Sequence, residues 1–230
     1  MIETLFVDYD DTLHDSDFKF INRFTPLADE FGLTGKELWD IYLLKVHRGI
    51  VHRRFPEKHD DVEFHCKLIF QYLNEPFDLR LAKQVIKSYE IAERECWENP
   101  TFFPDTFKFL NKVAGEYKVC LTTTRHGLEK ALSLEKRGKR RYFNHVFEEN
   151  IVGHRKLEPD YYKKVLELSG SSPEGALSIG NALALDVLPA MRVGIKAIWV
   201  NRKGEPHPPN FEPVQEVRDL LEVLNYLEKN

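Results

Sequence analysis

Two aspartates, Asp8 and Asp10, stand one residue apart directly after a short apolar run near the start of the chain. Like charges at this separation raise each other's pKa, so such a pair is costly unless a cation or a catalytic task accounts for it. Two neighbouring carboxylates can act as nucleophile and general acid or base, and they can also hold a hard cation such as Mg²⁺. Because the chain has 37 acidic residues, the pair alone identifies no chemistry.

The elements around the pair indicate where it would lie. The run from Ile2 to Val7 predicts a buried strand, and further strands are predicted at Lys118–Leu121, His145–Phe147, Leu177–Ile179 and Ala197–Val200. Amphipathic helices separate these strands, which is typical of βαβ units and a parallel sheet. Ligands of such sheets bind at the carboxyl ends of the strands. Polar residues follow three of the predicted strands, namely Asp8, the threonines at 122–124 and Asn181, so we expect them to share one edge.

A different pattern occupies residues 16–99. Thr34 and Glu37 have the spacing of a capping box, and behind Asp78 the apolar residues from Leu81 to Cys96 recur at helical intervals. The sequence therefore predicts an α/β fold in which a helical module is inserted between the first two strands.

Composition limits the function. The chain has 230 residues, 42% of them hydrophobic, and a formal net charge of −4, so no global basic field recruits nucleic acid. Three scattered cysteines fit no disulfide framework, and no run of 18 apolar residues predicts a membrane span. The N-terminal run contains Glu3 and Asp8 and is unlike a signal peptide. We expect a cytoplasmic protein that binds neither nucleic acid nor membrane.

Four motifs in order resemble those of the haloacid dehalogenase-like superfamily. They are Asp8-Tyr-Asp-Asp-Thr12-Leu13, Thr123 at a strand end, Lys156-Leu-Glu-Pro159-Asp, and Gly180-Asn181 followed by Asp186. The resemblance covers nearly the whole chain. It implies a Rossmann-like core formed by residues 1–15 and 100–230, with a helical cap domain at 16–99, and it points to the phosphatase branch.

The resemblance implies a hydrolase that removes phosphate from small phosphomonoesters with Mg²⁺. Asp8 would attack phosphorus to form an aspartyl-phosphate, and Asp10 would protonate the leaving alcohol and later activate water. Thr123, with Thr122 as the alternative register, would donate to a phosphoryl oxygen, and Lys156 would offset its charge. Thr124 and Arg125 are candidate substrate contacts. The metal ligands would be Asp8, the Asp10 carbonyl, Asn181 and Asp186.

One departure from the family pattern keeps two alternatives open. Asn181 stands where the family carries aspartate, which removes a negative charge and favours a catalytically silent binding module. An asparagine here, with Tyr162 after Lys156, also resembles the metal-independent 2-haloacid dehalogenases. Asp10 argues against that alternative, because a halide leaves without a proton. Asp186 or Asp11 could compensate for the missing charge.

Histidines at 47, 52, 59 and 65 lie in the helical module, five, seven and six residues apart. These separations match no compact zinc motif, so we expect the four side chains to face solvent rather than a metal.

Overall fold

The structure is a computed structural model and describes residues 1–206 and 215–229. The chain divides into two compact units, one made of Met1–Asp15 with Pro100–Asn230 and the other of Ser16–Asn99. Within the described residues, no helix combines the length and the apolar character that crossing a bilayer requires.

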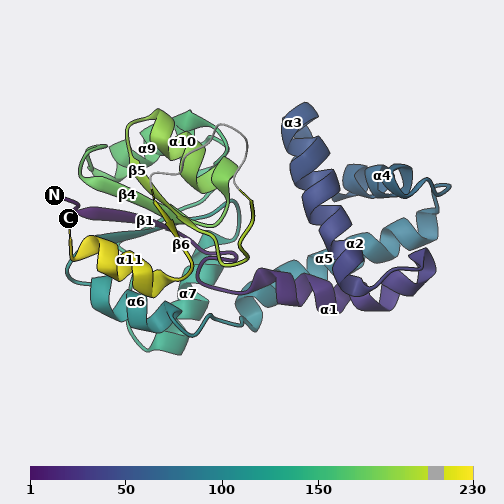
Figure 1. The fold of residues 1–230 in the computed structure, drawn as a ribbon, viewed down its shortest axis with the longest axis horizontal. Coiled ribbons are helices and arrows are strands. Elements are labelled where there is room, and N and C mark those ends of the chain that lie inside the picture. Colours follow the sequence, from purple (N-terminus) through teal and green to yellow (C-terminus); the bar gives the residue numbers. More distant parts are fainter. Residues whose placement is uncertain (207–214, 230) are drawn as a thin grey trace. The chain divides into compact units, whose positions relative to one another are not determined.

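The first unit is built on a six-stranded sheet whose strands, over the described residues, lie in the order β3-β2-β1-β4-β5-β6 (Figure 1). All neighbouring strands are parallel. The strands are β1 (Thr4–Asp8), β2 (Lys118–Thr122), β3 (His145–Phe147), β4 (Ala176–Gly180), β5 (Lys196–Val200) and β6 (Glu216–Val217). The predicted α/β class with a Rossmann-like parallel sheet is confirmed. The sequence analysis missed β6, because two residues are too few to show a period.

Helices cover both faces of this sheet (Figure 1). One face packs against α6 (Thr106–Val113), α7 (Gly127–Gly138) and α11 (Leu220–Leu227), and the other against α8 (Glu149–Val152), α9 (Pro159–Ser169) and α10 (Leu188–Arg192). A π-helical turn, η4 (Leu183–Val187), precedes α10. Alternate strand residues point to opposite faces, so Leu5 and Val7 enter the first core while Phe6 enters the second.

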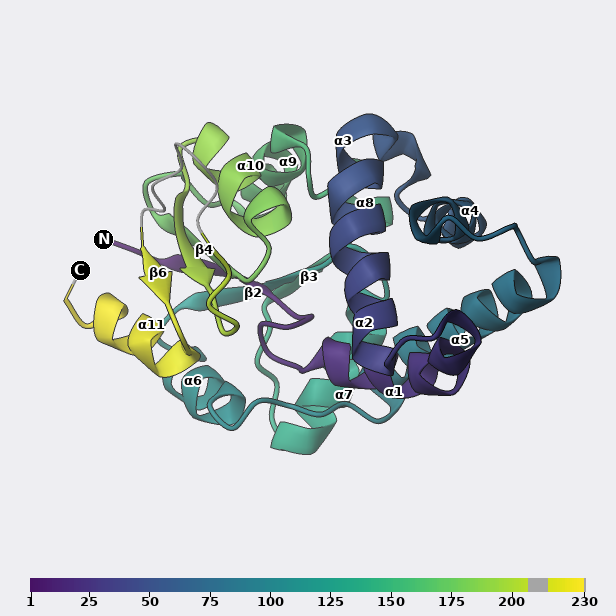
Figure 2. The same ribbon diagram turned by 45° about the vertical axis from the view of Figure 1, so that its right-hand side comes forward.

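The second unit is helical in its described elements. They are α1 (Ser16–Ala28), η1 (Asp29–Phe31), α2 (Gly35–Asp40), the π-helix η2 (Ile41–Val51), α3 (His52–Arg54), η3 (Pro56–Lys58), α4 (Val62–Leu73) and α5 (Leu79–Glu98). Figure 2 shows α2, η2 and α3 running on as one continuous coil. The capping box of Thr34 and Glu37 is present, and Asp78 caps α5, as predicted. Phe20 stacks on Trp39 in the core of this unit, with ring centroids 4.3 Å apart.

Candidate active site

The predicted site residues of the first unit gather at the carboxyl ends of β1, β2 and β4. Asp8 ends β1 and is in register with Thr122 at the end of β2, while Asn181 directly follows β4. The sheet order places β1 between β2 and β4, and the chain reverses its direction of winding at β1 and β4. Such a switch point is where open parallel sheets bind ligands.

The loop after β1 is folded tightly, and this aims its carboxylates. Tyr9 is fully buried in the core, so period-two alternation turns Asp8 and Asp10 away from it. The carbonyl of Tyr9 accepts the backbone N–H groups of Thr12, Leu13 and His14, and Asp11 adopts a left-handed φ of 57° to close the turn. A short polar side chain tolerates that conformation better than most residues.

Lys156 is the cation at the centre of the site. Its side chain is 1% exposed, and its Nζ lies 2.6 Å from Asp8 Oδ1 and 2.6 Å from Asp186 Oδ1. It also donates to the carbonyl of Thr122 at 3.0 Å. Two of the three ammonium protons are donated in hydrogen bonds, to Asp8 Oδ1 and to the Thr122 carbonyl, while Asp186 Oδ1 forms an ion pair. The structure thus brings together three of the predicted site residues, Asp8, Lys156 and Asp186.

The two carboxylates share this single ammonium group, and their protonation reflects it. Burial, and then the charge of Asp186, raise the pKa of Asp8 to about 7, although Lys156 opposes the shift. Burial alone would lower the pKa of Lys156, but the carboxylates of Asp186 and Asp8 hold it well above its usual value. Lys156 therefore stays charged, and Asp8 is a buried carboxylate with too little positive charge around it.

Asp186 has contacts that differ from the expected role of metal ligand. Its Oδ1 forms an ion pair with Lys156 but has no hydrogen-bond partner among the described residues, and its Oδ2 accepts the backbone N–H of Ala182 at 2.8 Å. A Cβ on Gly180 would lie 2.2 Å from Asp186 Cγ, so the glycine is what lets this side chain pack against the end of β4. In this arrangement Asp186 holds Lys156 and the loop after β4.

Lys130, which the sequence analysis missed, holds the second carboxylate. Its Nζ lies 2.6 Å from Asp10 Oδ2 and 3.0 Å from the hydroxyl of Thr123, and it lies over the ring of Tyr9. Burial acts to raise the pKa of Asp10, but Lys130 and, more weakly, His14 outweigh it and lower that pKa. The signal was present in the sequence, because Lys130 stands on the buried stripe of α7 with Ala131 and Leu134.

The threonines at the end of β2 contact different lysines. Thr123 offers its hydroxyl to Lys130, whereas Thr122 offers its backbone carbonyl to Lys156. The Thr122 hydroxyl is buried and has no hydrogen-bond partner among the described residues. Thr124 and Arg125 follow on the loop into α7 and are partly exposed. Of these two threonines, only Thr123 has its hydroxyl on the Asp10 side of the site.

Asn181 is fixed by contacts with the loop after β1 and with strand β5. Thr12, a further residue that the sequence analysis did not single out, donates its hydroxyl to Asp8 Oδ2 at 2.9 Å and accepts the N–H of Asn181 at 3.1 Å. The side-chain oxygen of Asn181 lies 3.4 Å from the same hydroxyl. The indole N–H of buried Trp199 donates to the Asn181 carbonyl at 2.8 Å. The carboxylate of Asp8 and the amide of Asn181 therefore meet at one hydroxyl group.

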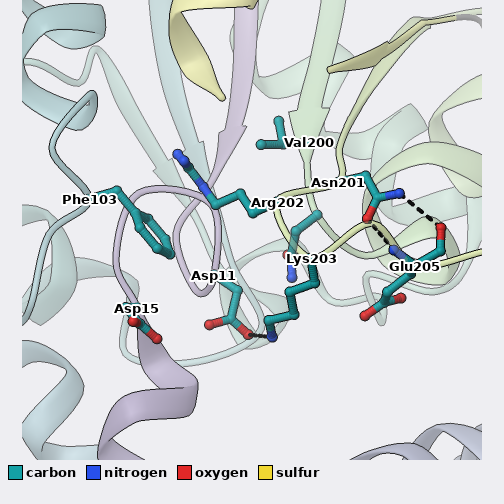
Figure 3. A pocket seen from close by; sticks show the side chains of 9 residues that line it. Asp11, Asp15, Phe103, Val200, Asn201, Arg202, Lys203 and Glu205 are labelled. Carbon is teal, nitrogen blue, oxygen red and sulfur yellow. Dashed lines mark hydrogen bonds and ion pairs between the residues drawn. The ribbon is translucent and has the colours of Figure 1, made fainter. Parts of the chain in front are cut away.

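A cavity of about 240 Å³ opens beside this cluster, and Figure 3 shows its lining. Asn181 and Asp11 line it, whereas Asp8, Asp10 and Lys156 do not, so the cavity adjoins the carboxylates rather than covering them. Lys203 reaches Asp11 at 3.6 Å across it. Arg202 donates to the Thr12 carbonyl and to both oxygens of Asp105, which ties the first loop to the start of α6.

The donor set fits a hard divalent cation. The carboxylate of Asp8, the side-chain oxygen of Asn181 and the backbone carbonyl of Asp10 are oxygen ligands of the kind that Mg²⁺ prefers. The three carboxylates of Asp8, Asp10 and Asp186 face only two ammonium groups, those of Lys130 and Lys156, which leaves one negative charge. A buried carboxylate whose pKa is raised to about 7 is stabilised as an anion by a nearby cation.

Comparison with known proteins identifies the family. A model of haloacid dehalogenase-like hydrolases matches residues 5–200, which is most of the chain. The chain belongs to this family. The resemblance seen in the four motifs is thereby confirmed. The fold is shared with solved structures: the putative HAD-hydrolase YfnB of Bacillus subtilis, solved with magnesium bound, has a TM-score of 0.77 at 21% identity over 98% of both chains.

The relatives of known function differ in how much of the chain they match. A pyrimidine 5'-nucleotidase of Streptococcus pneumoniae is 31% identical over 90 residues, which span 39% of this chain and 38% of that protein. A glyceraldehyde 3-phosphate phosphatase of Pyrococcus furiosus is 24% identical over 86% of this chain and 80% of its own. The fold also occurs in a 2-haloacid dehalogenase of Pseudomonas syringae, with a TM-score of 0.64 and 20% identity over 100% of this chain and 99% of that one.

Proposed function

We propose that the chain is a Mg²⁺-dependent phosphatase of small phosphomonoesters that acts through an aspartyl-phosphate on Asp8. The observation that carries the proposal is the second carboxylate. Asp10 is held at 2.6 Å by Lys130, beside the hydroxyl of Thr123 and on the same loop as Asp8. A carboxyl group in this position can act as the general acid when an alcohol leaves, because the alkoxide must gain a proton.

The chemical steps follow from the positions of these groups. An oxygen of Asp8 attacks phosphorus while the bond from phosphorus to the ester oxygen breaks, and Asp10 gives a proton to the leaving alcohol. This step uses the acid form of Asp10, which is the minor form in the free chain because Lys130 lowers the pKa of Asp10. In the second step water attacks phosphorus, Asp10 takes its proton, and the bond from Asp8 to phosphorus breaks to release inorganic phosphate. Proton transfer by a positioned side chain contributes about 10²- to 10⁴-fold to the rate.

The cations of the site orient these groups and offset charge. Lys156 holds Asp8 through Oδ1, while Thr12 holds Oδ2, so the nucleophile is fixed from both sides. The hydroxyl of Thr123 is a donor for a phosphoryl oxygen, and Lys130 beside it adds a positive charge. Preorganised donors of this kind stabilise the charge that develops during phosphoryl transfer.

We assign the metal to Asp8, the Asp10 carbonyl and Asn181, with Asp186 contributing charge through Lys156 rather than a direct bond. A phosphate dianion would enter a site that already has one excess negative charge, so binding needs further positive charge. When bound, Mg²⁺ would supply this charge and polarise the phosphoryl oxygens. The neutral amide of Asn181 makes the site weaker for Mg²⁺ than a carboxylate would.

The relatives support a small phosphorylated substrate. The pyrimidine 5'-nucleotidase and the glyceraldehyde 3-phosphate phosphatase both act on phosphomonoesters, as their names state. We include a cytoplasmic location in the proposal, because all three cysteines are free thiols buried in the structure.

The alternative activity, 2-haloacid dehalogenation, loses one of its two supports in the structure. Tyr162 is fully buried, and its hydroxyl donates to the carbonyl of Leu185 at 3.0 Å, so it serves the packing of α9 against η4. Dehalogenation also requires no general acid, because a halide leaves without a proton, so it does not account for Asp10 and its partner Lys130. Asn181 still favours the silent module, and this alternative is resolved by measuring turnover.

The test is a release assay on the purified chain. The substrates are a pyrimidine 5'-nucleotide, glyceraldehyde 3-phosphate, p-nitrophenyl phosphate and a 2-haloacid, each with Mg²⁺ and with a chelator. We expect phosphate release that requires Mg²⁺ and disappears in Asp8→Asn. The matched control is Asp160→Asn, an exposed carboxylate on α9 that pairs with Lys163. Halide release that survives the chelator would contradict the proposal, and so would the absence of phosphate release from all esters.

A further inference from the structure

Three of the four histidines in the second unit form a cluster, contrary to the expectation that they face solvent. The ligand nitrogens of His47, His52 and His59 all lie within 4.8 Å of one another. Their ring centroids are 4.4–4.8 Å apart. His59 is buried, while His47 and His52 are half-buried, so the cluster is packed and still reachable from solvent.

A π-helical turn explains why the sequence spacing was misleading. His47 lies in η2, and the backbone N–H of His52 donates to the carbonyl of His47, an i→i+5 bond. This bond stacks residue i+5 over residue i, so two histidines five residues apart share a face. In an α-helix the same spacing would turn them well apart. The chain then turns back through η3, which brings His59 against both rings.

Two hydrogen bonds within the cluster are compatible with a shared ion. His52 Nε2 lies 2.9 Å from His59 Nδ1, and His47 Nε2 donates to the carbonyl of His59 at 3.3 Å. Two nitrogens bound to one tetrahedral Zn²⁺ at 2.0–2.1 Å lie roughly 3.3 Å apart. An opening of a few tenths of an ångström between His52 and His59, with rotation of the His47 ring, would place the three nitrogens around one ion.

The fourth histidine shows what an imidazole with a purely structural role looks like in this unit. His65 Nε2 donates to the carbonyl of Lys58 at 2.8 Å, and its Nδ1 accepts the hydroxyl of Tyr42 at 3.0 Å. Both ring nitrogens are thus satisfied by groups that are not histidines. The three clustered rings instead face one another.

The electrostatics of the cluster disfavour the charged form of two of its rings. Burial, and then the charges of His59, Arg48 and His65, lower the pKa of His52 to about 3. Burial and the other three histidines likewise hold the pKa of His47 well below its usual value. Neutral imidazole is the form that binds metals.

We propose that His47, His52 and His59 bind a divalent transition metal of the imidazole-preferring class, represented by Zn²⁺. Three nitrogen donors without a carboxylate suit Zn²⁺, Cu²⁺ or Ni²⁺ and not Mg²⁺ or Ca²⁺. The site is therefore separate in chemistry from the oxygen cluster of the first unit. It joins η2, α3 and the segment after η3, and three protein ligands leave one coordination position open.

The test measures metal binding directly and does not depend on enzymatic activity. The metal-free chain is titrated with Zn²⁺ in a calorimeter with excess Mg²⁺ present, which occupies the oxygen ligands. In parallel it is titrated with Co²⁺, whose visible absorption reports nitrogen coordination. We expect one equivalent of Zn²⁺ and a Co²⁺ spectrum typical of a tetrahedral site. In His52→Gln we expect the affinity to fall at least about 100-fold, because changes outside the coordination sphere alone cost 10- to 100-fold.

Two further variants serve as a control and as a second test of the ligand assignment. The matched control His145→Gln changes an exposed histidine of the first unit and should bind Zn²⁺ as the original chain does. His47→Gln removes a second ligand and should reproduce the loss if His52→Gln fails to fold. The proposal is overturned if the original chain shows no saturable binding of Zn²⁺. It is equally overturned if a folded His52→Gln or His47→Gln variant binds with unchanged affinity, because the metal would then lie elsewhere.

Discussion

Replacement of Lys130 by methionine should move the pH dependence of catalysis upward. Lys130 lowers the pKa of Asp10 through a contact of 2.6 Å, and methionine keeps the length of the side chain without the charge. Leaving-group protonation needs Asp10 in its acid form, so the rate falls as the pH rises through that pKa. Without Lys130 the pKa is higher, and the alkaline limb of the profile moves to higher pH.

The size of the shift follows from the contact and its exposure. A hydrogen bond between charged groups is worth about 1.5–3 kcal/mol, and the Asp10 side chain is 36% exposed, so screening by solvent favours the lower value. At 1.36 kcal/mol for each pKa unit, about 1.5 kcal/mol corresponds to a shift of roughly one unit.

The assay compares pH profiles of kcat/KM for an alkyl phosphate and for p-nitrophenyl phosphate. Because p-nitrophenolate leaves without help, only the alkyl phosphate profile should move. Lys136→Met is the control, since Lys136 is exposed on the same helix, α7. An alkaline limb that stays in place in Lys130→Met, or one that moves equally for both substrates, would refute the assignment of Asp10 as the acid controlled by Lys130.

Three further predictions concern stability and metal affinity. The pKa of Asp8 is about 7 in the folded chain against 3.8 for the unfolded group, so this group stabilises the metal-free fold at low pH and loses that effect as the pH rises through 7. The melting temperature of Asp8→Asn, measured in chelator, should therefore rise relative to that of the original chain when the pH is raised from 5 to 8. A difference between the two melting temperatures that is the same at pH 5 and at pH 8 would contradict this. Gly180→Ala places a Cβ 2.2 Å from Asp186 Cγ and should cost about 1–3 kcal/mol in denaturant unfolding, whereas Gly175→Ala, whose closest contact is 3.3 Å, should be mild. Asn181→Asp should tighten Mg²⁺ binding measured by calorimetry, and unchanged affinity would remove Asn181 from the ligand set.

The sheet and its site edge could be predicted from the sequence because strong local signals coincide there. Apolar runs marked five of the strands within two residues, and polar residues directly follow three of them. The short strand β6 was missed, since its existence depends on pairing with β5 rather than on its own pattern.

The contacts between side chains from distant segments could not be predicted from the sequence. Lys130 stands on the buried stripe of α7, but only the folded chain shows that it holds Asp10 and that Thr12 links Asp8 with Asn181. The motif predicted Asp186 as a site residue, and its contacts with Lys156 and the Ala182 N–H depend on the turn after β4. The histidine cluster was misjudged because the separations were compared only with compact zinc motifs, whereas the π-helix η2 and the turn after it bring the three rings together.

The central claim is that Asp8 is phosphorylated during turnover, and it can be measured directly. The chain is mixed with a substrate ester and Mg²⁺, quenched in acid within the first turnover, and digested for mass spectrometry. We expect the peptide that contains Asp8 to carry one phosphoryl group, which Asp8→Asn abolishes. Turnover in which that peptide stays unmodified, or in which another residue carries the phosphoryl group, would contradict the account.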